Sequence, residues 1–233
     1  MKNSIVYLLL AGSLFLSPLC SAQSWDVDKI ENLHQWTFRM SRGADSLGYS
    51  RFEVRRIGKQ ILVSEDSRVP GFYEDMFLYL NGQTLAPDSV LITGRLSGYP
   101  IETKFRWNEN VVKGYANFPK SAKKPTSSLT KELPENTKPR LASFVLSPFY
   151  KDLKEGMKFS YPQFSSMDGA VRTVTAHVVG SETVNLNGME IEAYRLELSG
   201  GVAEQNVFID KAQPRIVKIS FRNIDWIYEL INP

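Results

Sequence analysis

The chain of 233 residues has one cysteine, Cys20, and two histidines, His34 and His177. One cysteine cannot form a disulfide within the chain or a cysteine-based metal cluster. Neither histidine has a second histidine or a carboxylate at the spacing of zinc ligands, so we expect no metal site. The sequence also lacks Gly-x-Ser-x-Gly, Gly-x-x-x-x-Gly-Lys and Gly-x-Gly-x-x-Gly. The common serine-hydrolase and nucleotide-binding loops are therefore missing, and we predict no catalytic residue and no cofactor.

Acidic residues stand side by side at two places, Glu65-Asp66 and Glu74-Asp75. Paired carboxylates serve glycoside cleavage. Neighbouring residues of a strand point to opposite faces, however, so neither pair converges by itself. A hydrolase with dispersed acidic residues remains an alternative, which needs acids that meet only in the folded chain.

Positive and negative charges nearly balance over the chain as a whole, because the formal net charge is only +3. That value is too small to indicate nucleic-acid binding. Basic residues do gather in a segment rich in Pro, Ser and Lys, 119–140, which contains what we call the basic cluster: Lys120, Lys123 and Lys124. The segment is either a solvated loop or a surface that contacts an anionic membrane or an acidic partner.

Only the N-terminus is apolar over a long run. A positively charged start at Lys2 precedes the apolar run Ile5–Leu16, and small residues lead to a cleavage site after Ala22. This layout predicts a secretory signal peptide, since a transmembrane helix needs ~20 apolar residues. Lipid attachment at Cys20 is disfavoured, because Leu19 occupies a position where a small residue is expected. We expect a periplasmic or secreted protein.

Period-two alternation of apolar and polar residues dominates the rest of the chain. In the clearest case Ile101, Phe105 and Trp107 face one way while Glu102 and Lys104 face the other. Such segments recur about every eight to twelve residues, which is typical of all-β folds. We predict a mainly β protein, an antiparallel curved sheet or half-barrel meander with one short helical segment near 141–153.

The predicted layout has four parts. They are a cleaved signal peptide (1–22), an N-terminal β-rich half (23–118), the basic loop (119–140), and a C-terminal short helix with a β-meander (141–233). Periodicity leaves open whether the two β halves form one sheet.

Aromatic residues on the apolar strand faces are the candidate ligand-binding set, namely Trp36, Phe38, Phe105 and Trp107. Core packing is the ordinary role of such residues. The alternative is that a half-open curved sheet leaves some of them lining a groove for an acyl chain.

The second half resembles an uncharacterised family of exported bacterial proteins, domain of unknown function 3108. The resemblance covers residues 140–222 and is carried by the runs Ala142–Gly156, Gly188–Leu196, Val207–Asp210 and Pro214–Lys218. It implies a curved, open β-sheet that wraps a short helix, as in lipoprotein carriers, and it implies no activity.

These observations favour an exported, non-enzymatic β-rich envelope protein that holds an apolar ligand such as a lipid or acyl chain. The first alternative is a structural or assembly partner of an envelope complex. A peripheral contact with an anionic membrane through the basic cluster is compatible with both, and the oligomeric state is left open.

Overall fold

The computed structural model describes residues 25–30, 33–117 and 127–231, most of which form β-strands, as predicted. The first half contains η1 (Val27–Ile30), β1 (His34–Arg42), β2 (Asp45–Ile57), β3 (Gln60–Val69), β4 (Phe72–Asn81), β5 (Pro87–Leu96), β6 (Tyr99–Asn108), β7 (Val111–Asn117) and β8 (Ser127–Glu132). The second half contains β9 (Lys138–Pro139), α1 (Arg140–Val145), η3 (Ser147–Phe149), β10 (Lys158–Phe164), β11 (Val171–Leu186), β12 (Met189–Ser199), β13 (Gln205–Asp210), β14 (Ile216–Phe221) and β15 (Ile227–Leu230).

The strands form one sheet, in the order β8-β7-β6-β5-β4-β3-β2-β1-β15-β14-β13-β12-β11-β10-β9. Each half of the chain is thus a meander of neighbouring strands. The halves join where β1 pairs with β15, with Phe38 opposite Leu230 and Met40 opposite Tyr228. Neighbours are antiparallel except for β9 and β10, which are parallel. The two β halves that periodicity could not relate therefore share a continuous hydrogen-bonded sheet.

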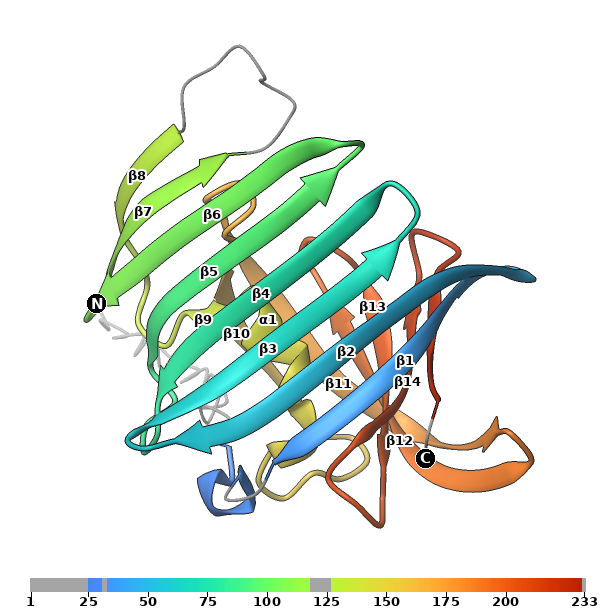
Figure 1. Ribbon diagram of the computed structural model, residues 1–233. Helices are drawn as coiled ribbons and strands as arrows, with labels where there is room; N and C mark the ends of the chain where they lie inside the picture. The colour runs from blue at the N-terminus through green and yellow to red at the C-terminus, as the bar shows by residue number, and fades with distance from the viewer. Residues whose placement is uncertain (1–24, 31–32, 118–126, 232–233) are drawn as a thin grey trace, which may run out of the picture.

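The sheet curves around α1, which lies between the layer made by β1–β6 and the layer made by β10–β14 (Figure 1). Apolar residues on the concave face alternate with exposed ones, as in β1, where Trp36, Phe38 and Met40 are buried. Phe144 of α1 meets Phe52 of β2 edge-on, with ring centroids 5.6 Å apart. The short helix thus fills the space that the curved sheet encloses, and its apolar residues complete the core.

The helical segment is shorter than the predicted range 141–153. α1 ends at Val145, and the next turn, η3, is a 3-10 helix that contains Pro148. Proline has no backbone N–H and therefore cannot continue the i to i−4 hydrogen bonds of an α-helix. Gly156, beyond this segment, has a positive φ of 78°, a conformation that glycine adopts without strain.

The segment 119–140 is not a loop throughout, because it contains β8 and β9. The alternation that makes β8 a strand is short, with Leu129 partly buried between exposed neighbours. These two strands are the edges of the sheet. β8 also approaches the turn between β10 and β11, where Lys131 Nζ donates a hydrogen bond to the Gly169 carbonyl at 3.3 Å. The sheet therefore curls far enough to bring one edge against a turn of the other half.

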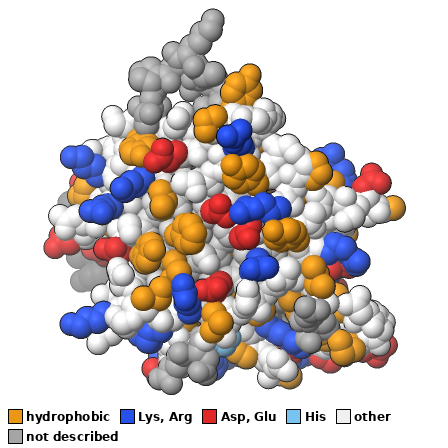
Figure 2. All heavy atoms as spheres, in the orientation of Figure 1, with side chains coloured by type: hydrophobic (Ala, Val, Ile, Leu, Met, Phe, Trp, Pro, Cys, Tyr) orange, Lys and Arg blue, Asp and Glu red, His pale blue; other side chains and the backbone are white. Residues whose placement is uncertain are grey.

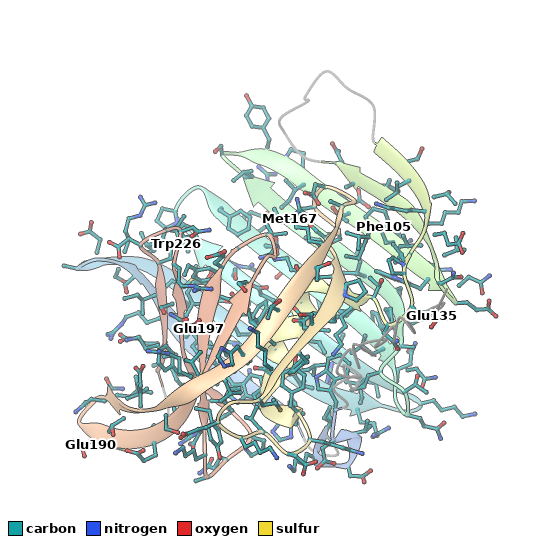
Figure 3. All side chains as sticks on the ribbon, turned by 180° about the vertical axis from the view of Figure 1, so that it is seen from behind. Phe105, Glu135, Met167, Glu190, Glu197 and Trp226 are labelled. Carbon is teal, nitrogen blue, oxygen red and sulfur yellow. The ribbon has the colours of Figure 1, made fainter. Side chains whose placement is uncertain are left out.

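The longest hairpin, β11–β12, projects beyond the rest of the sheet, with Glu190 near its tip (Figure 3). Its turn has positive φ at Asn187 and Gly188 (52° and 84°), as the two-residue turn of a twisted hairpin requires. Among the described residues, no helix has both the length and the apolar character needed to cross a bilayer.

Candidate functional site

Lys138 is the most unusual charged residue of the structure. It begins the two-residue strand β9 and lies opposite Gln163 of β10. Its residue surface is only 9% exposed, and it is the one lysine of the described segments that is buried. Lysine is almost never fully buried unless it is paired, so its surroundings are informative.

Four aromatic rings surround the Lys138 ammonium. Its Nζ lies 3.8 Å from the ring centroid of Trp25, 4.6 Å from Tyr161, 5.6 Å from Tyr150 and 5.7 Å from Phe159. Trp25 is held in place by an isolated β-bridge to Tyr150 and by stacking on its ring, with centroids 6.0 Å apart. These distances fit cation–π attraction, which strengthens where the cation is desolvated. We call this arrangement the lysine cage.

The lysine cage contains no negative charge. Within the described part of the chain no carboxylate oxygen lies within 4.0 Å of Lys138 Nζ, and no hydrogen bond from Nζ is present. Burial lowers the pKa of Lys138 to about 8, because the charged form loses its hydration. Burial also raises the pKa of Tyr161 to about 12, so its hydroxyl keeps its proton at neutral pH. The cage thus holds a cation that has aromatic faces but no counter-ion from the residues that the structure describes.

Lys138 lines a cavity of about 900 Å³. Its walls come from the β4–β5 turn (83–87), the end of β6 at Trp107, the connection 133–137 between β8 and β9, and residues 159–162 of β10. Glu135 in that connection lies near the lower edge of the sheet (Figure 3). A cavity of this size falls within the range of ~300–1,000 Å³ that small-molecule sites occupy. We call it the large cavity.

Two further hydrogen-bond donors in the walls of the large cavity have no acceptor among the described residues. They are the indole Nε1 atoms of Trp25 and Trp107, both buried. A buried donor without a partner costs about 1–3 kcal/mol. Together with Lys138, they place three donors in these walls, which also contain the carboxylates of Glu109 and Glu135.

The structure separates the four aromatic residues predicted as a ligand-binding set. Trp36, Phe38 and Phe105 are at most 4% exposed and belong to the core. Phe105 contacts Phe164 edge-on, with centroids 5.3 Å apart. Trp107 is the member that lines the large cavity. The basic cluster at 120–124 lies outside the described residues.

The two histidines lie apart. His34 Nε2 is 2.9 Å from the Lys29 carbonyl oxygen, and the imidazole contacts the Phe149 ring edge-on. His177 on β11 lies opposite Glu197 of β12. The described residues contain no group of three or more His, Cys, Asp or Glu side chains that could hold a metal ion.

The acidic pairs split across the sheet, as alternation requires, but one member of each meets on the concave face. On the outer face Arg68 bridges Asp66 and Asp75 at 2.8 and 2.6 Å. On the inner face the β3–β4 register places Ser67 opposite Glu74 and Met76 opposite Glu65. We call Glu65 and Glu74 the inner acid pair.

The inner acid pair is electrostatically strained. Burial and, to a smaller extent, the charge of Glu65 raise the pKa of Glu74 to about 7, against the opposing charge of Arg140. Burial also raises the pKa of Glu65, against hydrogen bonds from Ser67 and Ser50 and the charge of Arg140. Glu65 Oε1 lies 2.7 Å from Ser67 Oγ and 3.3 Å from Ser50 Oγ. Two carboxylates near one another cannot both ionise easily, so the pair takes up a proton as the pH falls through about 7.

Comparison with known proteins identifies a family but no activity. The model of a family described as a protein of unknown function (DUF3108) matches residues 37–222. No curated protein and no solved structure matches the chain.

Proposed function

Since the chain belongs to the DUF3108 family, whose members are described as proteins of unknown function, we propose from the geometry of its site that it is a binding protein. Its ligand has an apolar chain and an anionic head, and the large cavity receives it. The observation that carries this proposal is the lysine cage, a buried cation with no counter-ion among the described residues, in the wall of a cavity of about 900 Å³.

The charge of the site favours a ligand with an anionic head group. Lys138 is paired with no carboxylate within the described segments, and burial lowers its pKa to about 8. A carboxylate or phosphate beside Nζ would favour the ammonium form and form charge-assisted hydrogen bonds, which are stronger than neutral ones. The unpaired indole N–H groups of Trp25 and Trp107 also require an acceptor rather than a donor. An anionic head supplies both.

A cationic head fits less well. Aromatic cages elsewhere bind quaternary ammonium groups, but here Lys138 of the protein already occupies the cage, with Nζ 3.8 Å from the Trp25 ring centroid. A second cation would meet like charge in a desolvated site. The aromatic rings therefore serve to hold the lysine, and the lysine serves to hold an anion.

The residues that line the large cavity favour a ligand with an apolar chain. Leu85 and Leu133 are buried residues of these walls, and Trp107 and Phe159 add aromatic surface. Burial of apolar chain is worth about 0.8 kcal/mol for each CH₂ group. The outer face of β1–β6 offers no such surface, because its hydrophobic, basic and acidic side chains are interspersed (Figure 2). Lipid-like molecules such as fatty acids have this combination of chain and head.

The place where the protein acts is part of the proposal. The pattern of residues 1–22 is that of a secretory signal peptide, and these residues lie outside those that the structure describes. We propose that the mature protein is exported and meets its ligand in the periplasm or outside the cell.

Replacement of Lys138 tests the proposal. Affinity for a long-chain fatty acid and for the fatty alcohol of equal length is measured by displacement of a fluorescent apolar probe. In Lys138→Met the fatty acid should bind about 10- to 100-fold more weakly, because a hydrogen bond to a charged group is worth about 1.5–3 kcal/mol. The alcohol should lose little, since the methionine keeps the apolar wall.

The matched control is Lys104→Met on β6, an exposed lysine on the outward side of the strand that carries Trp107. It removes the same charge from the chain and should leave both affinities unchanged. If Lys138→Met binds the acid as tightly as the unaltered protein does, or if the unaltered protein binds neither ligand, the proposal is wrong.

A further inference from the structure

The same lysine has a second chemical capability, because an amine without its proton is a nucleophile. An exposed lysine at neutral pH is almost entirely protonated, since its pKa is near 10.4. Lys138 differs in three structural respects. It is buried, no carboxylate within the described part of the chain stabilises its charge, and it borders a cavity with room for a reactant.

The balance between the two forms of Lys138 depends on its surroundings. Desolvation favours the neutral amine, whereas the aromatic faces of Trp25 and Tyr161, 3.8 and 4.6 Å from Nζ, favour the ammonium. Desolvation by burial lowers the pKa of Lys138 to about 8. At pH 8 about half of the molecules then carry a neutral Lys138 amine. Desolvation in an apolar pocket is a recognised way to activate a lysine.

We infer that Lys138 captures aliphatic aldehydes covalently, as a reversible imine, when their apolar chain enters the large cavity. This inference rests on the proposed function, because the same cavity holds the chain. An aldehyde differs from the anionic ligand only in its head group, and it requires the neutral form of the amine where the acid requires the ammonium.

The reaction balances without any further reagent. The lone pair of Nζ attacks the carbonyl carbon, the C=O π electrons move to oxygen, and proton transfer from nitrogen to oxygen gives a carbinolamine. Loss of the hydroxyl group with the second Nζ proton releases one water and leaves a C=N bond to the former aldehyde carbon. No atom is oxidised or reduced, and addition of water reverses the reaction.

The test is selective trapping in the intact mature protein. Decanal is added at pH 7, imines are reduced with borohydride, and peptide mass spectrometry measures the decyl adduct on each lysine. We expect at least about tenfold more adduct at Lys138 than at the exposed Lys104 and Lys113, because the neutral fraction of an amine sets its reactivity. The yield at Lys138 should level off above about pH 8, whereas the exposed lysines should continue to gain.

The control variant is Lys138→Arg, which keeps a cation in the cage and cannot form the adduct. Its circular dichroism should match that of the unaltered protein, and its remaining lysines should show the same low yield. Equal labelling of Lys138 and the exposed lysines overturns the inference. So does a yield at Lys138 that is the same for decanal and acetaldehyde, because the apolar chain then contributes nothing.

Competition separates this inference from the proposed function. A long-chain fatty acid in the large cavity should suppress the decyl adduct at Lys138 alone. Selective labelling that the fatty acid does not suppress supports the reactive amine and contradicts the proposed ligand. Lys138-dependent fatty-acid binding without selective labelling supports the proposed ligand and contradicts the reactive amine.

Discussion

Replacement of Glu74 by glutamine should remove a pH-dependent loss of stability. Burial raises the pKa of Glu74 from 4.5 to about 7 in the folded protein. The folded state therefore binds a proton more tightly than the unfolded state does, and the free energy of unfolding falls as the pH rises from about 4.5 to about 7. At 1.36 kcal/mol for each pH unit, the complete loss is about 3 kcal/mol. The loss is absent below pH 4.5 and complete above pH 7.

Glu74→Gln keeps the shape of the side chain but has no charge at any pH. Its unfolding free energy should equal that of the unaltered protein near pH 4 and exceed it by up to about 3 kcal/mol at pH 8. For a chain of this length that corresponds to a midpoint about 6–12 °C higher. Thermal and urea unfolding at a series of pH values between 4 and 8 measure the difference.

The control is Glu190→Gln, an exposed change near the tip of the β11–β12 hairpin, which should follow the unaltered protein at every pH. A difference between Glu74→Gln and the unaltered protein that is constant from pH 5 to pH 8 would refute the reasoning. Glu74 would then ionise in the folded protein as readily as in the unfolded chain, and the inner acid pair would not share a proton.

Two further changes test the packing of the sheet and the proposed membrane contact. Gly94→Ala should lower the unfolding midpoint and Gly180→Ala should not, because a Cβ at Gly94 would lie 2.1 Å from the Tyr73 carbonyl oxygen, whereas nothing lies within 4 Å at Gly180; equal midpoints in calorimetry would contradict the β4–β5 packing. Glutamine at all three positions of the basic cluster should weaken sedimentation with anionic vesicles at low salt, since each lysine contributes ~1 kcal/mol near such a surface. The same change should alter the free energy of unfolding by no more than about 0.5 kcal/mol. If the unaltered protein does not sediment with the vesicles, the membrane proposal is wrong.

Local pattern predicted the strands well, because alternation reports directly on which face is buried. Ile101 and Phe105 are buried while Glu102 and Lys104 are exposed, as the period of two requires. The pairing of β1 with β15 was beyond such reasoning, since Phe38 and Leu230 are at opposite ends of the described chain and no turn fixes their register. Long-range pairing depends on the whole core rather than on either strand.

The inner acid pair could have been found from the sequence. Pro70-Gly71 is a strong turn signal, and a hairpin closed there pairs Val69 with Phe72. Counting back along both strands places Glu65 and Glu74 on one face, two positions apart. Our prediction treated each acidic dipeptide separately. It stated only that the two members of a pair point to opposite faces, and it did not see that Glu65 and Glu74 meet.

Lys138 could not be recognised in this way, because its sequence neighbours are those of a basic loop. Its burial depends on Trp25, Tyr150 and Tyr161, which come from three separate segments. The one local signal is the buried run that follows, Leu141–Tyr150, which pulls the end of the loop inward. A lysine beside such a run can extend its head toward water, and only the fold reveals that this one does not.

The buried charges differ in whether another described side chain balances them. Asp210 is 7% exposed and forms an ion pair with Arg215 at 2.8 Å. Arg140 attracts the inner acid pair, which bears a single negative charge when it holds one proton. Lys138, two residues before Arg140, has no such partner in the described segments. Because an uncompensated buried charge is costly, and because this one lies in the wall of a cavity, the proposed anionic ligand would supply the negative charge that the described residues do not place beside it.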